Sequence, residues 1–442
     1  MESFVDREPG AGESQEGSGK PLHKYAGPSS WQQTPQDTLS PEQILCRYGK
    51  PGMRFLRAST ARLLVNASEA FPQMLAAIDA AAAQVSLETY TLRDDRAGQA
   101  FQQALIRAAG RGVHVRLLFD WIGSFSLSRT FVQQLLDAEV DVAAFHPLLV
   151  PRPVWALNKR DHRKILVVDD AVGFTGGLNL GEEYYPVSAG GQGWRDTHLG
   201  LEGPAVARAL RDLFEEAWRQ ATPYGATCSR RTRFKYTLQR RWTSLWRRKD
   251  RLPPTAVVSQ GVPVSLIGNQ LLRQRWRIHR AYLRAIRRAT RYVLIENAYF
   301  IPNRSFRQAL LAAARRGVFV AVVVSAASDV PITDYASRRL YDELLRGGVH
   351  LFAWPHSVMH AKTAVIDDVW SIVGSYNFDH RSLLHQLECV AVIADPGFAV
   401  GLRRQTLDDL ARCQEISLAA HRQRPRWQRL LESLAYLLRH WL

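Results

Sequence analysis

Hydrophobic residues between positions 60 and 400 form short, nearly unbroken runs that alternate with longer amphipathic segments. The runs at 113–119 and 318–324 are mostly apolar, which is typical of strands buried on both faces. The segments at 99–109 and 306–315 space their apolar residues three and four apart, which indicates helices with one buried side. This alternation predicts an α/β fold with a mainly parallel mixed sheet flanked by helices.

The same order of elements occurs twice along the chain. In each half a helix leads into a short strand that carries a glutamate, Glu88 in the first half and Glu296 in the second. The first of these helices is expected over 68–83, with Ser68 as its N-cap. The repetition predicts two pseudo-symmetric domains that build one shared active site at their interface.

Composition divides the rest of the chain. The N-terminal residues are rich in Gly, Ser, Pro, Gln and acidic side chains, which predicts disorder. The expected division is a disordered segment at 1–42, a first domain at 43–220, a basic aromatic insertion at 221–260, a second domain at 261–415 and an amphipathic C-terminal helix at 416–442.

The insertion and the tail each have two interpretations. Residues 229–251 hold ten basic residues and one acidic residue, interleaved with aromatics. This segment is either a solvated basic linker or an anchor with Trp at a headgroup interface and Arg on phosphates. Residues 426–442 place leucines and two tryptophans on one helical side, which either packs against the domain or lies in a membrane interface.

Each half ends in the pattern His-x-Lys-x4-Asp, at 162–169 and at 360–367. A second Asp follows in both copies, and then a Gly-rich motif that ends in Asn, at 176–179 and 374–377. His and Lys are two residues apart, so they point to the same side of a strand end. Two copies with identical spacing are not accidental, and together they supply a pair of histidines.

This pair of motifs suits chemistry on a phosphodiester. Two lysines and two amides at one phosphate offset the negative charge that grows in the transition state. One neutral histidine can attack phosphorus in line, while a protonated histidine gives its proton to the leaving oxygen. The pattern itself does not decide which histidine takes which role. The residues concerned are His162, Lys164 and Asn179 in the first copy and His360, Lys362 and Asn377 in the second.

Net charge and cysteine usage indicate which partners and which cellular compartment to expect. The formal net charge is +17, from 58 Lys and Arg against 41 Asp and Glu, which favours polyanions such as nucleic acid or an anionic bilayer. The four cysteines are scattered without a Cys-x-x-Cys, which argues against a disulfide framework or a zinc site and fits a reducing compartment. The sequence shows neither a signal-peptide pattern nor a run of ~18 apolar residues, so we expect no membrane span.

From about residue 60 to 415, the chain resembles the phospholipase D superfamily, whose signature is His-x-Lys-x4-Asp followed by Gly-Ser-x-Asn, twice per active site. The stretches at 194–198, 201–204, 297–302 and 379–382 are similar to those of bacterial cardiolipin synthases, in the branch without N-terminal membrane spans. The resemblance implies two phospholipase D-like domains, no metal or other cofactor, and a covalent phosphohistidine.

The resemblance also implies roles for individual residues. A carboxylate from the other half supports each histidine, so Glu388 would support His162 and Asp196 would support His360. Family precedent makes His162 the nucleophile and His360 the acid, although the sequence itself leaves that choice open. The catalytic set is His162, Lys164, Asp169, His360, Lys362 and Asp367, of which the two aspartates would hold strand turns, and the supporting set is Asn179, Asn377, Ser375, Asp196 and Glu388.

Two positions depart from the superfamily pattern. Gly177 stands where Ser is usual, although cardiolipin synthases resemble this chain there, and it removes one hydroxyl donor. Gln386 replaces the usual Asn two positions before the glutamate, which puts only local packing in doubt.

Three functions are compatible with these motifs. The first is phosphatidyl transfer from phosphatidylglycerol to a second phospholipid alcohol, with release of glycerol. The second is hydrolysis by the same site, as a phospholipase D or a nuclease, and the third is binding of anionic lipids without catalysis. The synthase-like stretches favour the first. They imply anionic phospholipid partners (phosphatidylglycerol and cardiolipin), with no nucleic acid as the first choice. The scattered cysteines, the missing signal-peptide pattern and the absent span predict a peripheral protein at the cytoplasmic face of a bacterial membrane.

Overall fold

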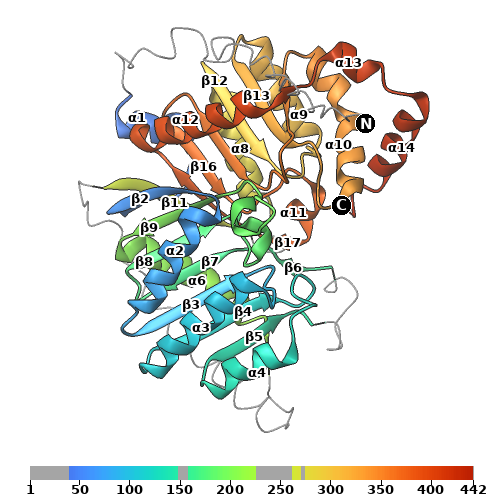
Figure 1. The fold of residues 1–442 in the computed structure, drawn as a ribbon. Helices are drawn as coiled ribbons and strands as arrows, with labels where there is room; N and C mark the ends of the chain where they lie inside the picture. Colours follow the sequence, from blue (N-terminus) through green and yellow to red (C-terminus); the bar gives the residue numbers. More distant parts are fainter. Residues whose placement is uncertain (1–38, 148–157, 225–260, 270–273, 442) are drawn as a thin grey trace, which may run out of the picture. The chain divides into compact units, whose positions relative to one another are not determined.

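The computed structural model describes residues 39–147, 158–224, 261–269 and 274–441 (Figure 1). The basic aromatic segment at 229–251 and residues 1–38 of the expected disordered segment lie outside these ranges. Residues from Leu39 onward form one compact unit. This unit contains two large mixed sheets flanked by helices, so the expected α/β class is confirmed.

The first sheet has eight strands in the order β10-β5-β4-β3-β7-β8-β9-β2. It is built from residues of the first half of the chain. The strands are β2 (Thr60–Val65), β3 (Gln84–Thr89), β4 (His114–Asp120), β5 (Asp141–Phe145), β7 (Ile165–Val168), β8 (Val172–Gly176), β9 (Thr197–Glu202) and β10 (Thr222–Pro223).

The second sheet has nine strands in the order β1-β11-β18-β16-β15-β12-β13-β14-β19. Apart from β1, this order repeats that of the first sheet when equivalent strands are matched, which is the internal duplication that the sequence predicted. The strands are β1 (Leu56–Ala58), β11 (Val262–Gly268), β12 (Tyr292–Asn297), β13 (Phe319–Ser325), β14 (His350–Trp354), β15 (Lys362–Ile366), β16 (Trp370–Gly374), β18 (Cys389–Ile393) and β19 (Gln414–Glu415).

Parallel pairing is limited to three neighbouring strands in each sheet, β3-β4-β5 and β12-β13-β14. The other neighbouring pairs in both sheets are antiparallel, which differs from the expected parallel majority. Apolar runs indicated burial on both faces, but such burial does not fix strand direction. The strands after each motif return through short turns, so they pair antiparallel with their neighbours.

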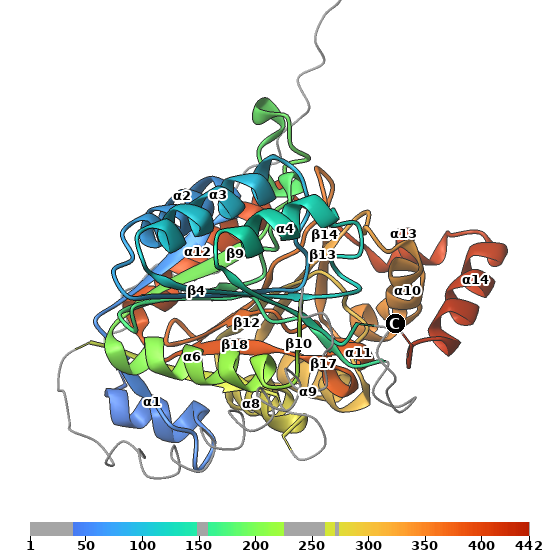
Figure 2. The same cartoon turned by 90° about the horizontal axis from the view of Figure 1, so that it is seen from below.

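Helices cover the faces of the sheets. In Figure 2, α2, α3 and α4 lie on one side of the first sheet and α6 lies on the other. In the second half, α8 and α9 pack together, while α12 contacts β15 and β16. The bounds are α2 (Asn66–Asp79), α3 (Arg96–Gly110), α4 (Arg129–Asp137), α6 (Pro204–Trp218), α8 (Trp276–Arg288), α9 (Arg304–Arg315), α10 (Pro331–Arg346), α11 (His380–Leu384) and α12 (Pro396–Arg412).

Helix α2 begins two residues earlier than predicted, and Ser68 is not its N-cap. Strand β2 runs directly into the helix at Val65, whose backbone N–H donates to the Glu69 carboxylate at 2.8 Å. The side-chain hydrogen bond at the start of this helix is therefore accepted by Glu69 of the first turn, and not by a serine hydroxyl.

The first described residues of the chain pack with the second half. Strand β1 pairs with β11 of the second sheet, and helix α1 (Pro41–Tyr48) contacts α8. The Tyr48 hydroxyl donates to Asp367 Oδ2 at 2.6 Å. Residues 41–58 therefore pack with the second half, although the sequence suggested that the first domain begins at 43. Residues 41 and 42, which were expected to belong to a disordered segment, are part of α1, which begins after a capping box at Ser40.

The C-terminal segment forms two helices instead of one, α13 (Leu418–Arg422) and α14 (Arg426–Leu437). Pro425 precedes the second helix, and a proline at such a position is compatible with a helix start but not with an unbroken helix. Helix α14 contacts α10 and lies on its outer side in both views (Figures 1 and 2).

Candidate active site

The aspartates that close the two motifs hold the turns after β7 and β15. Asp169 accepts hydrogen bonds at 2.7–2.8 Å from the backbone N–H groups of residues 82–84, where β3 begins. Asp367 accepts equivalent bonds at 2.8–3.0 Å from residues 290–292. Each aspartate and the one after it has a φ between 51° and 60°, a conformation that Asp tolerates better than most residues. Both lie at the opposite end of their strand from the motif histidine, so they order the hairpin without approaching the histidines.

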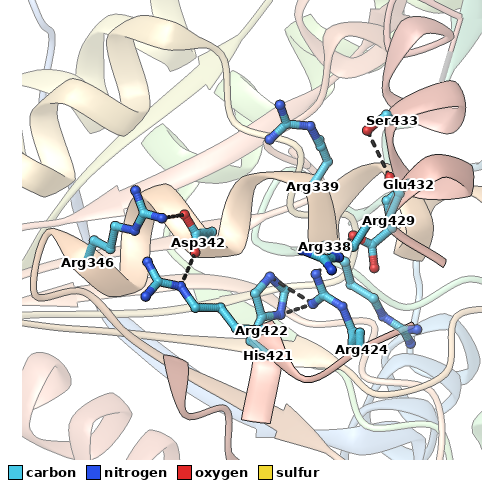
Figure 3. A pocket seen from close by; sticks show the side chains of 10 residues that line it. All are labelled: Arg338, Arg339, Asp342, Arg346, His421, Arg422, Arg424, Arg429, Glu432 and Ser433. Carbon is cyan, nitrogen blue, oxygen red and sulfur yellow. Dashed lines mark hydrogen bonds and ion pairs between the residues drawn. The ribbon is translucent and has the colours of Figure 1, made fainter. Parts of the chain in front are cut away.

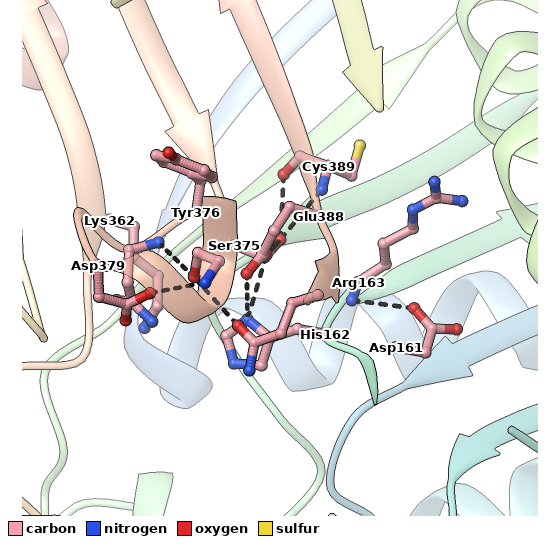
Figure 4. Close-up of polar contacts among 12 residues, drawn as sticks. Asp161, His162, Arg163, Lys362, Ser375, Tyr376, Asp379, Glu388 and Cys389 are labelled. Atoms are coloured by element: carbon pink, nitrogen blue, oxygen red, sulfur yellow. Dashed lines mark hydrogen bonds and ion pairs between the residues drawn. The ribbon is translucent and has the colours of Figure 1, made fainter. Parts of the chain in front are cut away.

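His162 meets a carboxylate from the second half. Its Nδ1 lies 3.0 and 3.1 Å from the two carboxylate oxygens of Glu388, and the Ser375 hydroxyl donates to the same carboxylate (Figure 4). A short parallel pair of strands, β6 (Arg160–Asp161) and β17 (Gln386–Leu387), brings these segments together. The backbone N–H of His162 donates to the carbonyl of Leu387 at 2.9 Å. The contact is therefore fixed by main-chain pairing between the halves.

His360 meets a carboxylate from the first half in the same way. Its Nδ1 lies 2.7 Å from Asp196 Oδ2 and 3.1 Å from the Tyr184 hydroxyl. An isolated parallel bridge between Arg195 and Met359 joins the two segments, and the His360 N–H donates to the Arg195 carbonyl at 2.7 Å. In both histidines Nδ1 is engaged by a carboxylate, so Nε2 is the nitrogen left for a substrate.

The motif lysines fold back onto their own histidines. Lys164 Nζ donates to the His162 carbonyl at 2.8 Å, and Lys362 Nζ donates to the His360 carbonyl. Burial lowers the pKa of Lys164 to about 7 and that of Lys362 to about 8, and the Lys362 ammonium adds to the lowering of the Lys164 pKa. An anionic phosphate placed between two such amines would favour their charged forms.

The two histidines differ in how readily they hold a proton. Burial, Lys164 and Lys362 together lower the pKa of His162 well below its ordinary value. Burial and Lys362 also lower the pKa of His360, but Asp196 opposes them. Burial opposes ionisation of Asp196, yet His360 and Lys362 outweigh it and lower the pKa of this carboxyl. Burial raises the pKa of Glu388 instead, well above its ordinary value. The pair of His360 and Asp196 is therefore the one that better supports a charged imidazolium.

The motif asparagines have different surroundings. Asn179 Nδ2 donates to the Tyr184 hydroxyl at 3.1 Å, and its Oδ1 accepts from the Thr91 N–H at 3.3 Å. Asn377 is buried, and its Oδ1 has no hydrogen-bond partner among the residues that the structure describes. Asn377 therefore retains an unsatisfied polar atom, the kind of group that a substrate can engage.

The structure explains the glycine at position 177. A Cβ added there would lie 2.0 Å from Asp196 Oδ1 and 2.7 Å from its Cγ. In the second half, Ser375 at the equivalent position donates instead to Glu388. Aspartate is one methylene shorter than glutamate, so its carboxylate takes up the space of the missing side chain. Gln386, the second departure, accepts from the Ser382 hydroxyl at 3.0 Å, which is a local packing contact.

Several aromatic residues around the histidines were not identified from the sequence. The ring of Tyr90 lies 5.0 Å from that of His162, and Lys164 Nζ lies 5.4 Å above the Tyr90 ring. The rings of Tyr184 and Trp194 each lie 5.8 Å from that of His360. Tyr90 could have been found from its position, because it follows the strand glutamate Glu88 by two residues. Nothing in the local pattern distinguished Tyr184, because its contact depends on the fold.

The structure brings most of the predicted residues together. The two histidines influence each other's surroundings electrostatically, together with both lysines, Asp196 and Glu388. Asp169 and Asp367 are the exceptions, because they lie at the far ends of β7 and β15. The buried arrangement offers two lysines and two imidazole Nε2 atoms to an anionic group, while Asn377 Oδ1 can accept a hydrogen bond from a hydroxyl.

Comparisons with known proteins identify the family of the chain. The family model described as cardiolipin synthase, phospholipase D-like domain, matches residues 74–218 and 282–409. These two matches cover the two halves and include both motifs. The chain belongs to the cardiolipin synthase family, and it is a phosphatidyltransferase of the phospholipase D superfamily.

Individual relatives support the family assignment. A cardiolipin synthase of Geobacillus sp. (strain WCH70) is 33% identical over 401 residues, which is 90% of this chain and 74% of the relative. One from Alkalihalophilus pseudofirmus is 32% identical over 406 residues, which is 90% of this chain and 75% of the relative. The phosphatidylserine synthase of Haemophilus influenzae has a TM-score of 0.69 at 14% identity, covers 91% of this chain and 100% of that chain, and shares the fold.

Proposed function

We propose that this synthase transfers a phosphatidyl group from phosphatidylglycerol to the hydroxyl of a second phospholipid alcohol, through a phosphohistidine, and releases glycerol. The observation that carries the proposal is the paired histidine arrangement, in which each Nδ1 is held by a carboxylate from the opposite half. A carboxylate at Nδ1 fixes the imidazole so that Nε2 carries either a lone pair or a proton. Two such rings can serve as nucleophile and acid.

In the first step, His162 is the nucleophile. The Nε2 lone pair forms a bond to phosphorus, and the bond from phosphorus to the glycerol oxygen breaks. His360 Nε2 gives its proton to that oxygen, and glycerol leaves. The lower pKa of His162 supports a neutral nucleophile, and the ionised Asp196 supports a protonated His360. Lys164 and Lys362 would bind the non-bridging phosphate oxygens.

In the second step, the acceptor replaces glycerol. His360, now neutral, takes the proton of the acceptor hydroxyl as its oxygen attacks phosphorus, and the bond to His162 Nε2 breaks. Both residues return to their starting states, so the cycle balances. Water at ~55 M competes at this stage, and a buried site that favours a lipid alcohol limits hydrolysis. Both histidines are nearly inaccessible to solvent, which supports transfer over hydrolysis.

We further propose that the enzyme acts as a peripheral protein at the cytoplasmic face of the membrane. Across the described ranges, none of the helices combines the length and the apolar character needed to cross a bilayer. The net charge of +17 supports attraction to an anionic leaflet. The scattered cysteines support a reducing compartment.

Incubation of the purified protein with phosphatidylglycerol vesicles tests the proposal, with lipids and glycerol measured by mass spectrometry. We expect cardiolipin and free glycerol in near-equal amounts, with little phosphatidic acid. Added glycerol should drive the reaction backwards, because both directions share the intermediate. Phosphatidic acid as the main product would make the protein a phospholipase D, and cleavage of DNA without action on lipid would make it a nuclease.

A further inference from the structure

Helix α14 exposes its apolar side. Its buried residues are Glu432 and Ala435, which face α10, whereas its large apolar residues lie on the opposite side. The periodicity of the sequence could not decide between packing and exposure, and the structure shows exposure among the described residues. On α14 the exposed fractions are 58% for Trp427, 62% for Leu430, 42% for Leu431, 51% for Leu434 and 67% for Leu437, and in the turn after it they are 48% for Leu438 and 72% for Trp441.

A basic pocket lies beneath this helix. It occupies about 350 Å³ between α10, α13 and α14, and Figure 3 shows the arginines that line it. Only two carboxylates, those of Asp342 and Glu432, accompany the arginines in this lining. The arginines are Arg338, Arg339, Arg346, Arg422, Arg424 and Arg429. The pocket therefore carries a large excess of positive charge.

The two carboxylates are already engaged. Asp342 pairs with Arg346 and Arg422, each at 2.9 Å, and Glu432 pairs with Arg424 at 3.0 Å. Three arginines of the pocket have no carboxylate within 4.0 Å among the described residues, namely Arg338, Arg339 and Arg429. A guanidinium in this situation binds phosphate well, because its planar donors match phosphate oxygens.

The turn that follows α14 reaches toward the catalytic segment. The ring of His440 lies 4.5 Å from that of His380, the first residue of α11. Helix α11 follows Asn377 and leads through β17 to Glu388. A second pocket, lined by Tyr436, Arg439 and His440 together with residues of α9 and α11, lies at this junction. The exposed helix is therefore joined to the segment that carries the partner of His162.

We propose that α14 and the arginine pocket dock the enzyme on an anionic phospholipid bilayer. The leucines and tryptophans enter the boundary between headgroups and acyl chains, and a lipid phosphate is bound by Arg338, Arg339 and Arg429. An apolar helical side bordered by cations is the arrangement of an interfacial helix, and tryptophan is favoured at that depth. The charge of the pocket selects a bilayer over a protein partner with an apolar groove. This inference deepens the proposed function and rests on it for the choice of lipid.

Vesicle co-sedimentation of the full chain tests this docking surface. The first variant is Leu430→Ser, Leu434→Ser and Leu437→Ser, whose positions are too exposed for the change to remove core packing. Its control is Phe125→Ser and Val187→Ser, which removes apolar residues that are 78% and 73% exposed elsewhere. On phosphatidylglycerol vesicles we expect the leucine variant to lose at least about tenfold in affinity and the control less than about twofold.

The second variant is Arg338→Gln, Arg339→Gln and Arg429→Gln. Its control removes the same charge from exposed positions outside the pocket, as Arg129→Gln, Arg280→Gln and Arg404→Gln. At about fivefold for each basic residue near an anionic surface, the pocket variant should lose about 100-fold in affinity and much of its salt dependence. The control should lose clearly less, because its arginines lie outside the pocket.

Three outcomes would overturn the docking surface. They are wild-type affinity in both variants, equal losses in variants and controls, and salt-independent binding to purely zwitterionic vesicles. A leucine variant that changes from dimer to monomer while it keeps vesicle affinity would instead assign the helix to contact between copies. Binding is measured apart from turnover, so a wild-type protein that binds vesicles but forms no product would contradict the proposed function alone.

Discussion

Replacement of Gly177 by alanine tests how Asp196 is positioned. The new Cβ would lie 2.0 Å from Asp196 Oδ1, so the carboxylate must retreat by roughly 1.4 Å to regain ordinary contact at 3.4 Å. Asp196 is held by His360 at 2.7 Å and by the Thr197 N–H at 2.7 Å. A displacement of that size breaks the bond to His360, because hydrogen bonds weaken steeply beyond ordinary distances.

The magnitude follows from the bond that is lost. A hydrogen bond to a charged group is worth about 1.5–3 kcal/mol, which corresponds to a loss of about 10- to 100-fold in kcat if the bond acts in the transition state. Without Asp196, the pKa of His360 falls further. As the general acid, His360 must be protonated, so the high-pH limb of the kcat profile should move to lower pH.

The assay is cardiolipin formation from phosphatidylglycerol over a range of pH, with thermal unfolding measured in parallel. Gly110→Ala is the matched control, because a Cβ there meets nothing within 4 Å and the position is helical. We expect the control to keep the wild-type rate and pH profile. If Gly177→Ala keeps the wild-type kcat and an unshifted limb, the assignment of Asp196 as the support of His360 is refuted.

Three further predictions concern the two histidines, the absence of a metal and the aspartates that hold the strand turns. His162→Ala and His360→Ala should each abolish turnover in a product assay, with a loss of about 10²–10⁴ for the acid and a larger loss for the nucleophile, and near-wild-type activity in either would exclude the two-histidine mechanism. EDTA should leave the rate unchanged, and inhibition that one specific metal reverses would contradict the metal-free chemistry that the resemblance implies. Asp367→Ala should lower the free energy of unfolding more than Asp169→Ala in denaturant titrations. Each change leaves three N–H groups unpaired, but Asp367→Ala also leaves the buried Tyr48 hydroxyl unpaired, at about 1–3 kcal/mol for each buried group. Equal losses would refute this ranking.

The sequence predicted the parts of the molecule that depend on local pattern. Alternation of apolar runs and amphipathic segments located the repeated strands and helices, and the paired motifs located both histidines. The contacts of Glu388 and Asp196 were expected from the family resemblance, because these residues lie far from their histidines in the sequence. The directions of the strands could not be predicted in the same way, since an apolar run indicates that a strand is buried but not whether the neighbouring strand is parallel or antiparallel.

The remaining features depend on packing between distant segments. Strand β1 precedes the strands of the first sheet along the chain but pairs with β11 of the second sheet, with Arg57 opposite Pro263. No local pattern in the sequence indicates this pairing. Tyr184 contacts His360 across 176 residues, so no local pattern marks it. The periodicity of α14 showed an apolar side, but the residue that packs against α10 is the small Ala435, in a cluster with Ala336 and Leu340.

Direct detection of the covalent intermediate tests the central claim. The enzyme is mixed with phosphatidylglycerol, denatured within a fraction of a turnover and digested, and the peptides that contain His162 and His360 are examined by mass spectrometry. The proposed mechanism predicts a phosphatidyl adduct on His162 and none on His360, with no adduct in His162→Ala. An adduct on His360, or rapid cardiolipin formation with no adduct on either histidine, would contradict it.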